Sequence, residues 1–328
     1  MAERIRVVDG PSGLDALIIL DDTTLGPAVG GVRTRVYPTP GALEEDARRL
    51  ARAMTIKCAL AGLAAGGGKI VVDASKLADR ARAFEALGVA VEELGGRLLT
   101  AGDYGTTAED LACMARRTRQ VHTAPGLPEA VARGLVGCAL AAVRALGHQA
   151  LFGRSALVQG AGTIGAAVAR ALGAAGASVI VCDLDPARAH AVAEAIGARE
   201  IPAEAALTTP CDLFVPCATG GVIDLAVAEV LPARAVVGGA NNVLASAEAG
   251  ARLFARGVLE VPDPISSAGA VIAGVAPRLM RVAPEPLIDA LGATAASVLL
   301  EAKATQRPPG EVAYRRAQAR VSHATPPR

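Results

Sequence analysis

Aromatic side chains are nearly missing from this chain of 328 residues, which has no Trp, three Tyr and four Phe. Apolar residues still make up 52% of it, so a core of Ala, Val and Leu can form and a disordered chain is excluded. The length predicts two domains rather than one. An alanine-rich surface is apolar for a monomer, and we expect burial in a homo-oligomer, a dimer or higher.

An excess of charge of one sign is also missing, because 33 basic residues face 32 acidic ones. This balance argues against a nucleic-acid partner, which needs a one-sided basic surface. Gly, Arg or Asp interrupts each apolar run before it reaches a length that crosses a membrane, so no membrane partner is expected. The first ten residues, MAERIRVVDG, lack the apolar stretch of a signal peptide, and we expect a cytoplasmic protein.

Histidine is scarce and the cysteines are not arranged in motifs. The chain has four His and six Cys, with no C-x-x-C pair and no Cys/His cluster at the spacing of metal ligands. We therefore expect reduced core thiols and no metal site.

What is present is an alternation of short apolar strands and helical segments. The patterns predict strands at 15–20, 69–72, 97–101, 212–216, 235–239 and 258–261, and helices at 41–60, 77–95, 107–118, 130–147 and within 285–328. A glycine run precedes the strand at 69–72, and residues 120–130 form a turn-rich break. Short turns between alternating strands and helices are typical of a doubly wound parallel sheet, which makes this an α/β protein.

A dinucleotide-binding motif is formed by Gly160, Gly162 and Gly165, spaced as G-x-G-x-x-G between an apolar strand and a helix. The first glycine makes the turn, the second lets backbone approach a pyrophosphate, and the third lets helix and strand pack closely. Asp183 ends the next strand, where a carboxylate binds ribose hydroxyls and repels a 2′-phosphate, so NAD is favoured over NADP. The alternative for the three glycines is a turn that only packs tightly. The alternative for Asp183 is a surface acid, and Asp185 is a competing candidate for its role.

A possible reaction set lies in the first third of the chain. Lys57 lies toward the end of the helix at 41–60, Lys69 follows Gly66–Gly68, and Asp103 ends the strand at 97–101. A lysine acts as a base only if burial or a second cation lowers its pKa. Lys57 could be that cation, or it could bind a substrate carboxylate. The alternative is that both lysines extend to solvent and Asp103 caps a helix.

At these residues the chain resembles the leucine/phenylalanine/valine/glutamate dehydrogenase family, and most of all its leucine and valine dehydrogenase branch. The matching stretches run in the family's order over nearly the whole chain. They are Asp22 to Arg33, Met54 to Lys57, Gly66 to Lys69, Asp103 with Gly105 to Thr107, Gly160 to Gly165, Pro216 to Ala218 with Gly220, and Gly239 to Asn242.

The resemblance implies a role for each candidate residue. Lys69 is implied as the catalytic lysine that activates water, and Asp103 as the group that moves protons to and from the α-nitrogen. Lys57 is implied to bind the substrate carboxylate. The other substrate-binding residues that it implies are Gly30, Gly31 and Asn242, and the cofactor-binding residues are Gly160, Gly162, Thr163, Ile164, Gly165, Asp183, Cys217, Ala218, Thr219, Gly239 and Asn241.

The resemblance also implies the domain plan and the reaction. Residues 1–130 are expected to form an α/β substrate, catalytic and oligomerisation domain, and 131–285 a Rossmann-type, doubly wound NAD-binding domain. Helices in 286–328 are expected to pack back towards the first domain. The expected reaction is the reversible, NAD-dependent oxidative deamination of an L-α-amino acid with a small or branched aliphatic side chain to a 2-oxo acid and ammonia.

The chain departs from the family's pattern at several positions. Gly102 stands where a Glu is usual, Val131 replaces a Thr, Ser267–Ala270 replaces Asn-Ala-Gly-Gly, and Arg35 replaces a large apolar residue. The loop at 122–130 is several residues shorter than in the family. Two alternatives therefore stay open: a specialised relative that acts on a non-standard amino acid or a cyclic imine, and a catalytically silent NAD-binding protein.

Overall fold

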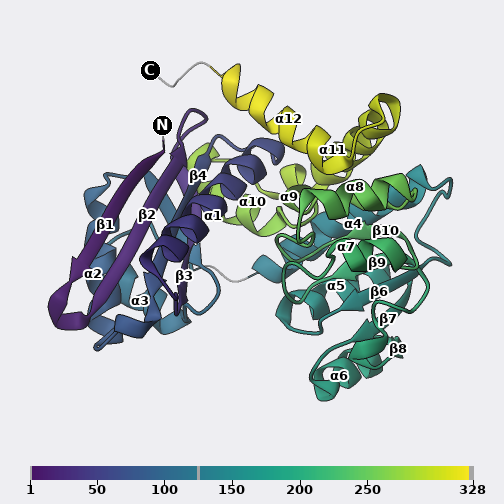
Figure 1. Cartoon of the computed structure of the whole chain (residues 1–328), viewed down its shortest axis with the longest axis horizontal. Coiled ribbons are helices and arrows are strands. Elements are labelled where there is room, and N and C mark those ends of the chain that lie inside the picture. Colours follow the sequence, from purple (N-terminus) through teal and green to yellow (C-terminus); the bar gives the residue numbers. More distant parts are fainter. Residues whose placement is uncertain (1, 124–125, 325–328) are drawn as a thin grey trace. The chain divides into compact units, whose positions relative to one another are not determined.

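The computed structural model describes residues 2–123 and 126–324. The chain divides into two units, shown in Figure 1. Unit 1 comprises Met1–Pro125, Arg278–Arg281 and Ala317–Arg328. Unit 2 comprises Gly126–Pro277 and Val282–Arg316. The α/β class expected from the sequence is confirmed, since each unit is a sheet with helices packed on it.

Unit 1 contains a five-stranded sheet of order β1-β2-β4-β3-β5. Its strands are β1 Glu3–Asp9, β2 Leu14–Asp22, β3 Ala28–Arg35, β4 Gly66–Asp73 and β5 Leu98–Gly102. The strand β3 is parallel to both β4 and β5, whereas β2 is antiparallel to β1 and β4. The carboxyl ends of β3, β4 and β5 therefore lie at one edge of the sheet.

The helices of unit 1 cover both faces of this sheet. The helix α1, Pro40–Leu60, packs on the face that carries Leu17 and Ile19 of β2. The helices α2, Arg80–Glu93, and α3, Ala108–Ala115, cover the opposite face (Figure 1), where Ile18 and Leu20 belong to the core. Alternation of side chains along a strand explains this division, and it makes β2 apolar at every position from Ala16 to Leu20.

Unit 2 is built on a six-stranded parallel sheet of order β11-β10-β9-β6-β7-β8. Its strands are β6 Ser155–Gln159, β7 Ser178–Cys182, β8 Arg199–Glu200, β9 Cys211–Pro216, β10 Ala233–Val237 and β11 Leu259–Val261. In chain order this is the 3-2-1-4-5-6 arrangement of a dinucleotide-binding fold. The order reverses between β6 and β9, so a crevice is expected beyond the carboxyl ends of those two strands.

The helices of unit 2 follow the alternation expected of this fold. They are α4 Leu127–Ala145, α5 Thr163–Ala174, α6 Pro186–Ile196, α7 Leu225–Val230, α8 Ala247–Ala255, α9 Asp263–Ser266, α10 Gly269–Val275 and α11 Glu285–Thr305, followed by α12 Pro309–Ser322. The helix α11 packs closely on α4, because a Cβ added to Gly292 would lie 2.9 Å from the carbonyl oxygen of Gly137. The end of α12 belongs to unit 1, where Arg320 donates to the carbonyls of Ala59 and Leu63.

Glycine-rich segments account for the main differences from the predicted elements. The glycines Gly66–Gly68 lie inside β4 and do not precede it, so that part of the prediction is wrong. The segment of Gly30 and Gly31 is itself a strand, β3, which the sequence did not indicate. Glycine is unfavourable in strands by propensity. Close packing overrides that preference here, because a Cβ on Gly30 would lie 1.7 Å from the Gly68 carbonyl oxygen.

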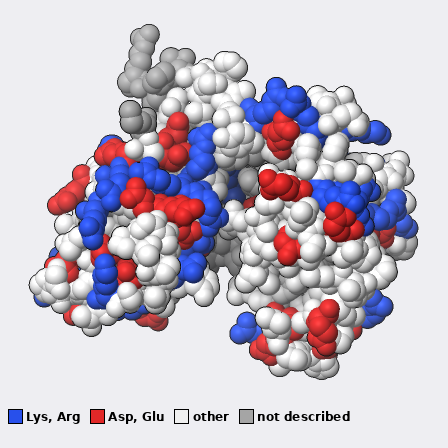
Figure 2. Space-filling model, in the orientation of Figure 1, with Lys and Arg blue, Asp and Glu red and all other residues white. Residues whose placement is uncertain are grey.

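In residues 2–123 and 126–324, no helix is both long and apolar enough to cross a membrane. The same residues include no cluster of three His, Cys, Asp or Glu side chains placed to hold a metal ion. On the face shown in Figure 2, acidic and basic side chains lie intermixed.

We expect Gly67→Ala to destabilise the protein by about 1–3 kcal/mol or to prevent folding. The added Cβ would lie 2.2 Å from the backbone nitrogen of Thr55, which forces α1 away from β4. Thermal unfolding of the purified protein followed by circular dichroism measures the effect. Gly10→Ala is the control, since a Cβ there meets nothing within 4 Å. Equal melting temperatures for the two variants would contradict this account of the α1–β4 contact.

Candidate active site

Three neighbouring strands of unit 1 bring a lysine, an arginine and an aspartate together. Lys69 lies within β4, Arg33 near the end of β3, and Asp103 directly after β5. The Nζ atom of Lys69 lies 2.5 Å from Oδ2 of Asp103, and Nε of Arg33 donates to the same oxygen at 3.1 Å. Lys69 is only 5% exposed, so two cations meet one carboxylate oxygen in a largely buried place.

The environment shifts the pKa values of both partners. Burial lowers the pKa of Lys69 because its charged form loses hydration, and the charge of Arg33 lowers it further, against the opposing effect of Asp103. Burial of Asp103 would raise its pKa, but the charges of Lys69 and Arg33 outweigh that effect and hold the pKa at about 2. At neutral pH the site therefore holds an ionised carboxylate beside a lysine that releases its proton more readily than usual.

Lys57 lies in the last turn of α1 and is 7% exposed. The helix touches β4 at Thr55 and Gly67, so each lysine follows that point of contact by two residues. The sequence allowed Lys57 to be either the cation that lowers the pKa of Lys69 or a carboxylate ligand. The charge of Arg33 lowers the pKa of Lys69 in the structure, and both uses of Lys57 stay predictions.

Gly30 and Gly31 lie against the reacting groups. Gly30 contacts the Gly68 carbonyl that precedes Lys69. A Cβ on Gly31 would lie 2.9 Å from the carbonyl oxygen of Gly102 and 3.0 Å from Cβ of Asp103. The absence of side chains at these two positions lets β3 and its neighbours close up, and it leaves bare backbone beside the lysine and the carboxylate.

Arg33 is the residue of this set that the sequence analysis missed, although it ends one of the matching stretches. One signal could have revealed it. Arg33 is two residues beyond Gly31, so on a strand both face the same side of the sheet. This relation is visible only if residues 28–35 are recognised as a strand, and the glycines in this segment argue against one.

The three glycines of the dinucleotide motif in unit 2 occupy distinct environments. Gly160 has a φ of +96°, which a residue with a side chain rarely adopts. A Cβ on Gly165 would lie 1.8 Å from the Gly160 carbonyl oxygen, so this glycine is required for the helix to approach the strand. A Cβ on Gly162 would meet nothing within 4 Å. That glycine therefore leaves open space at the start of α5, where Thr163 and Ile164 are the first helical residues.

The structure separates the roles of the two neighbouring aspartates after β7. The carboxylate of Asp183 accepts from the backbone nitrogens of Ala161, at 2.6 Å, and Asp185, at 2.8 Å. It therefore lies against the glycine loop. Asp185 instead caps α6 through the backbone nitrogen of Ala187. Of the two acids, Asp183 is the one beside the dinucleotide motif.

The loop after β9 meets the glycine loop at the reversal of strand order. The Cys217 nitrogen donates to the carbonyl of Gln159 at 2.7 Å, and a Cβ on Gly160 would lie 2.8 Å from that of Ala218. Burial raises the pKa of the Cys217 thiol to about 12, and Gly239 lies against its sulfur. Thr219 follows as an exposed residue. The Cys217 sulfur is thus buried against Gly239, and the loop meets Gly160 through Ala218.

A polar network holds the two asparagines that follow β10. The Asn242 nitrogen donates to Oδ2 of Asp263 at 2.8 Å, and Asn242 has a left-handed φ of +53°. Ser267 donates to Oδ1 of Asn241 at 3.3 Å and to the Asp263 carbonyl at 2.6 Å. The serine that departs from the family's pattern therefore orients Asn241.

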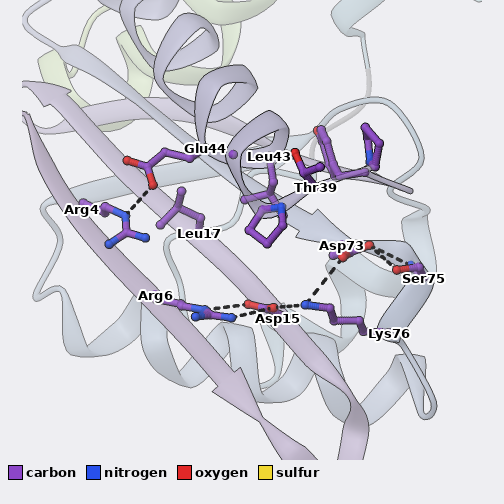
Figure 3. Close-up of a pocket in the computed structure, with 14 residues that line it drawn as sticks. Arg4, Arg6, Asp15, Leu17, Thr39, Leu43, Glu44, Asp73, Ser75 and Lys76 are labelled. Carbon is purple, nitrogen blue, oxygen red and sulfur yellow. Dashed lines mark hydrogen bonds and ion pairs between the residues drawn. The ribbon is translucent and has the colours of Figure 1, made fainter.

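A separate surface pocket of about 440 Å³ lies in unit 1 (Figure 3). Its charged lining residues form ion pairs with one another: Arg4 with Glu44, Arg6 with Asp15, and Lys76 with Asp15 and Asp73. Opposite charges are thus neutralised within the wall. Lys69 and Asp103 do not line this pocket, and we do not assign the candidate reaction to it.

Comparison with known proteins gives a consistent family. Residues 5–120 match a model described as Glu/Leu/Phe/Val dehydrogenase, dimerisation domain, and residues 184–276 match one described as Glutamate/Leucine/Phenylalanine/Valine dehydrogenase. The chain is 38% identical to leucine dehydrogenase of Bacillus subtilis (strain 168) over 80% of its own length and 75% of that protein. It is 36% identical to phenylalanine dehydrogenase of Bacillus thermotolerans over 83% and 76% of the two chains.

A solved structure extends the likeness to the whole fold. The crystal structure of L-tryptophan dehydrogenase from Nostoc punctiforme superposes with a TM-score of 0.86, at 28% identity, over 98% of this chain and 96% of that one.

Two alanine substitutions in the glycine loop test whether the space beside Gly162 is kept for a ligand. Gly162→Ala should leave the melting temperature of the free protein almost unchanged, yet weaken dinucleotide binding by at least about tenfold, or 1.4 kcal/mol. Gly165→Ala should instead lower stability by about 1–3 kcal/mol, because its Cβ overlaps backbone. Calorimetric titration with NAD and thermal unfolding separate the effects. Unchanged NAD affinity in Gly162→Ala would contradict the assignment.

Proposed function

Because the chain belongs to the Glu/Leu/Phe/Val dehydrogenase family, we propose that it is an NAD-dependent dehydrogenase that reversibly deaminates an L-α-amino acid to a 2-oxo acid and ammonia. The observation that carries the proposal is the contact of Lys69 with Asp103 beside bare glycine backbone. Burial that lowers the pKa of a lysine is how a protein makes this side chain a base at moderate pH.

The proposed chemistry divides the work among three side chains. Lys57 binds the α-carboxylate of the substrate. A bound NAD would supply the acceptor for the hydride of the α-carbon, whose loss would leave an iminium group on the substrate. Lys69 takes a proton from the water that attacks this carbon and returns it to the nitrogen of the carbinolamine. Ammonia then leaves as Lys69 takes up the proton of the hydroxyl group, which becomes the carbonyl of the 2-oxo acid. Asp103 lies 2.5 Å from the Lys69 nitrogen, within reach for a proton to pass between them.

The low pKa of Asp103 limits its part in this sequence. With a pKa of about 2, it carries no proton at neutral pH before the reaction begins. It therefore starts as an acceptor and as the counter-charge of Lys69. It becomes a donor only after a proton has been released within the site.

We propose a small or branched aliphatic side chain for the substrate. Glutamate would need an additional cation in the pocket. Arg35 is exposed and lies 5.2 Å from the centroid of the Tyr37 ring. Arg33 already contacts two carboxylates, Asp103 and Asp46. The charge of Arg33 is therefore already paired, and Arg35 is exposed rather than part of the buried site.

The division of labour and the assembly are proposals of the same kind. Residues 1–130 would act as the substrate, catalytic and oligomerisation domain, and 131–285 as the NAD-binding domain. The match of residues 5–120 to a dimerisation-domain model supports a homo-oligomer. We place this oligomer in the cytoplasm, where NAD, amino acids and ammonia are its small-molecule partners.

A substrate screen tests the activity. Purified protein with NAD is assayed with the common amino acids at alkaline pH, and with 2-oxo acids, ammonia and NADH in reverse, by absorbance of NADH. Lys69→Ala should lower kcat by at least about 100-fold without weakening NAD binding. Lys303→Ala, an exposed lysine of α11 in unit 2, is the control and should keep full activity. Absence of turnover in both directions would refute the proposal in this form.

The same screen distinguishes the alternatives. Activity confined to uncommon 2-oxo acids or cyclic imines would identify a specialised relative, in keeping with Gly102 and the short loop at 122–130. Tight NAD binding with no turnover would identify a silent binding protein.

Asp183 should set the preference for NAD. Asp183→Asn removes the negative charge but keeps an oxygen that can accept from Ala161. We expect kcat/KM with NAD to fall by roughly tenfold and the ratio of NAD to NADP activity to fall further, since the 2′-phosphate is no longer repelled. Asp185→Asn is the matched control, because asparagine also caps a helix well. An unchanged cofactor ratio in Asp183→Asn would rule out this role.

A further inference from the structure

We propose that Arg33 is a positioning residue, a guanidinium that fixes the carboxylate of Asp103 against Lys69, and that Asp46 and Tyr37 hold this guanidinium in place. The inference deepens the proposed function, and its kinetic consequences rest on that function. The arrangement of charges around Lys69 does not depend on the proposed function.

The first step is the shared oxygen of Asp103. Lys69 and Arg33 both contact Oδ2, so the carboxylate is held on one side by two cations. Its other oxygen, Oδ1, lies outside these two contacts, and the backbone of Tyr104 also hydrogen-bonds to the carboxylate. Because Asp103 follows the end of β5 rather than lying inside it, the strand alone does not fix its carboxylate.

The second step is the anchor of Arg33. Its Nη1 atom lies 3.4 Å from Oδ2 of Asp46, a residue of α1, and the hydroxyl of Tyr37 donates to that same oxygen at 2.7 Å. The other oxygen of Asp46 accepts from Arg49 at 2.6 Å. The side chains of Arg33 and Asp46 are 18% and 12% exposed. A partly buried guanidinium that bridges two carboxylates has little freedom to turn, and lysine cannot reproduce its fork.

Arg33 and Asp46 have opposite electrostatic effects on the pKa of Lys69. The charge of Arg33 lowers the pKa of Lys69, whereas Asp46 and Asp103 raise it. Arg33 itself faces Asp103, Asp46 and Tyr37.

The experiment measures the titration of Lys69 in the full chain without substrate. The rate at which 1-fluoro-2,4-dinitrobenzene labels Lys69 is followed against pH by mass spectrometry, with exposed Lys303 as the internal reference. Arg33→Gln should move the midpoint for Lys69 to higher pH. Asp46→Asn should move the midpoint to lower pH. The negative charge that raises the pKa of Lys69 is lost, and the positive charge of Arg33 is no longer partly neutralised by Asp46. Arg48→Gln, an exposed residue of α1 paired with Glu44, should leave the midpoint unchanged.

Kinetics then separate charge from position. Arg33→Lys keeps the charge, so the Lys69 midpoint should stay near that of the wild type. Its kcat should still fall, by up to about 100-fold, because one ammonium cannot hold both carboxylates in place. Tyr37→Phe should lower kcat less, with little change in the KM for the amino acid. Thermal unfolding identifies any variant that has lost its fold.

The outcomes distinguish the inference from the function on which it rests. Shifts of opposite sign in Arg33→Gln and Asp46→Asn support the charge arrangement even if no amino acid is turned over, which would refute only the proposed function. Shifts of the same sign, or none in folded variants, would overturn the inference whatever the activity. Full kcat in Arg33→Lys would show that Arg33 supplies charge and does not position Asp103.

Discussion

The close approach of α1 to β4 at Thr55 and Gly67 is the constraint on which the site in unit 1 depends. A helix normally rests on a sheet through a layer of side chains, but here the Thr55 backbone lies where a Cβ of Gly67 would be. This contact holds Lys57 of the helix and Lys69 of the strand close to the sheet. Gly30 provides the same close approach between β3 and β4. These two glycine positions thus let backbone meet backbone directly beside charged groups.

Burial and charge act against each other at that surface, and the balance determines its chemistry. An isolated buried carboxyl would take up a proton, and an isolated buried ammonium would lose one. Two cations on one oxygen keep Asp103 ionised, whereas burial remains the largest influence on Lys69. The pKa values of these two neighbouring groups are thus set by burial together with the opposite charges that each one meets. Asp46, on α1, contributes to this balance by forming an ion pair with Arg33.

Much of this was predictable from the sequence, for reasons that differ between elements. The strands β2, β6 and β7 are apolar runs bounded by turns, and α3 begins with a capping box of Thr107 and Asp110, a pattern of neighbouring residues. Lys69 and Asp103 were identified because motifs mark them. The strand β3 was not, since glycine propensity opposes a strand and only the contact with Gly68 explains one. Arg33 and Asp46 are 13 residues apart on different elements, and no local pattern predicts that they meet.

The charges beside the lysine have one further consequence. Lys69, Arg33, Asp103 and Asp46 carry two positive and two negative charges when all are ionised, so these four sum to zero and Lys57 adds one positive charge. A zwitterionic amino acid has no net charge. Because the net charge on either side is small, short-range alignment of neighbouring charges contributes more to recognition than distant fields do. Encounter with such a substrate should therefore depend only weakly on ionic strength.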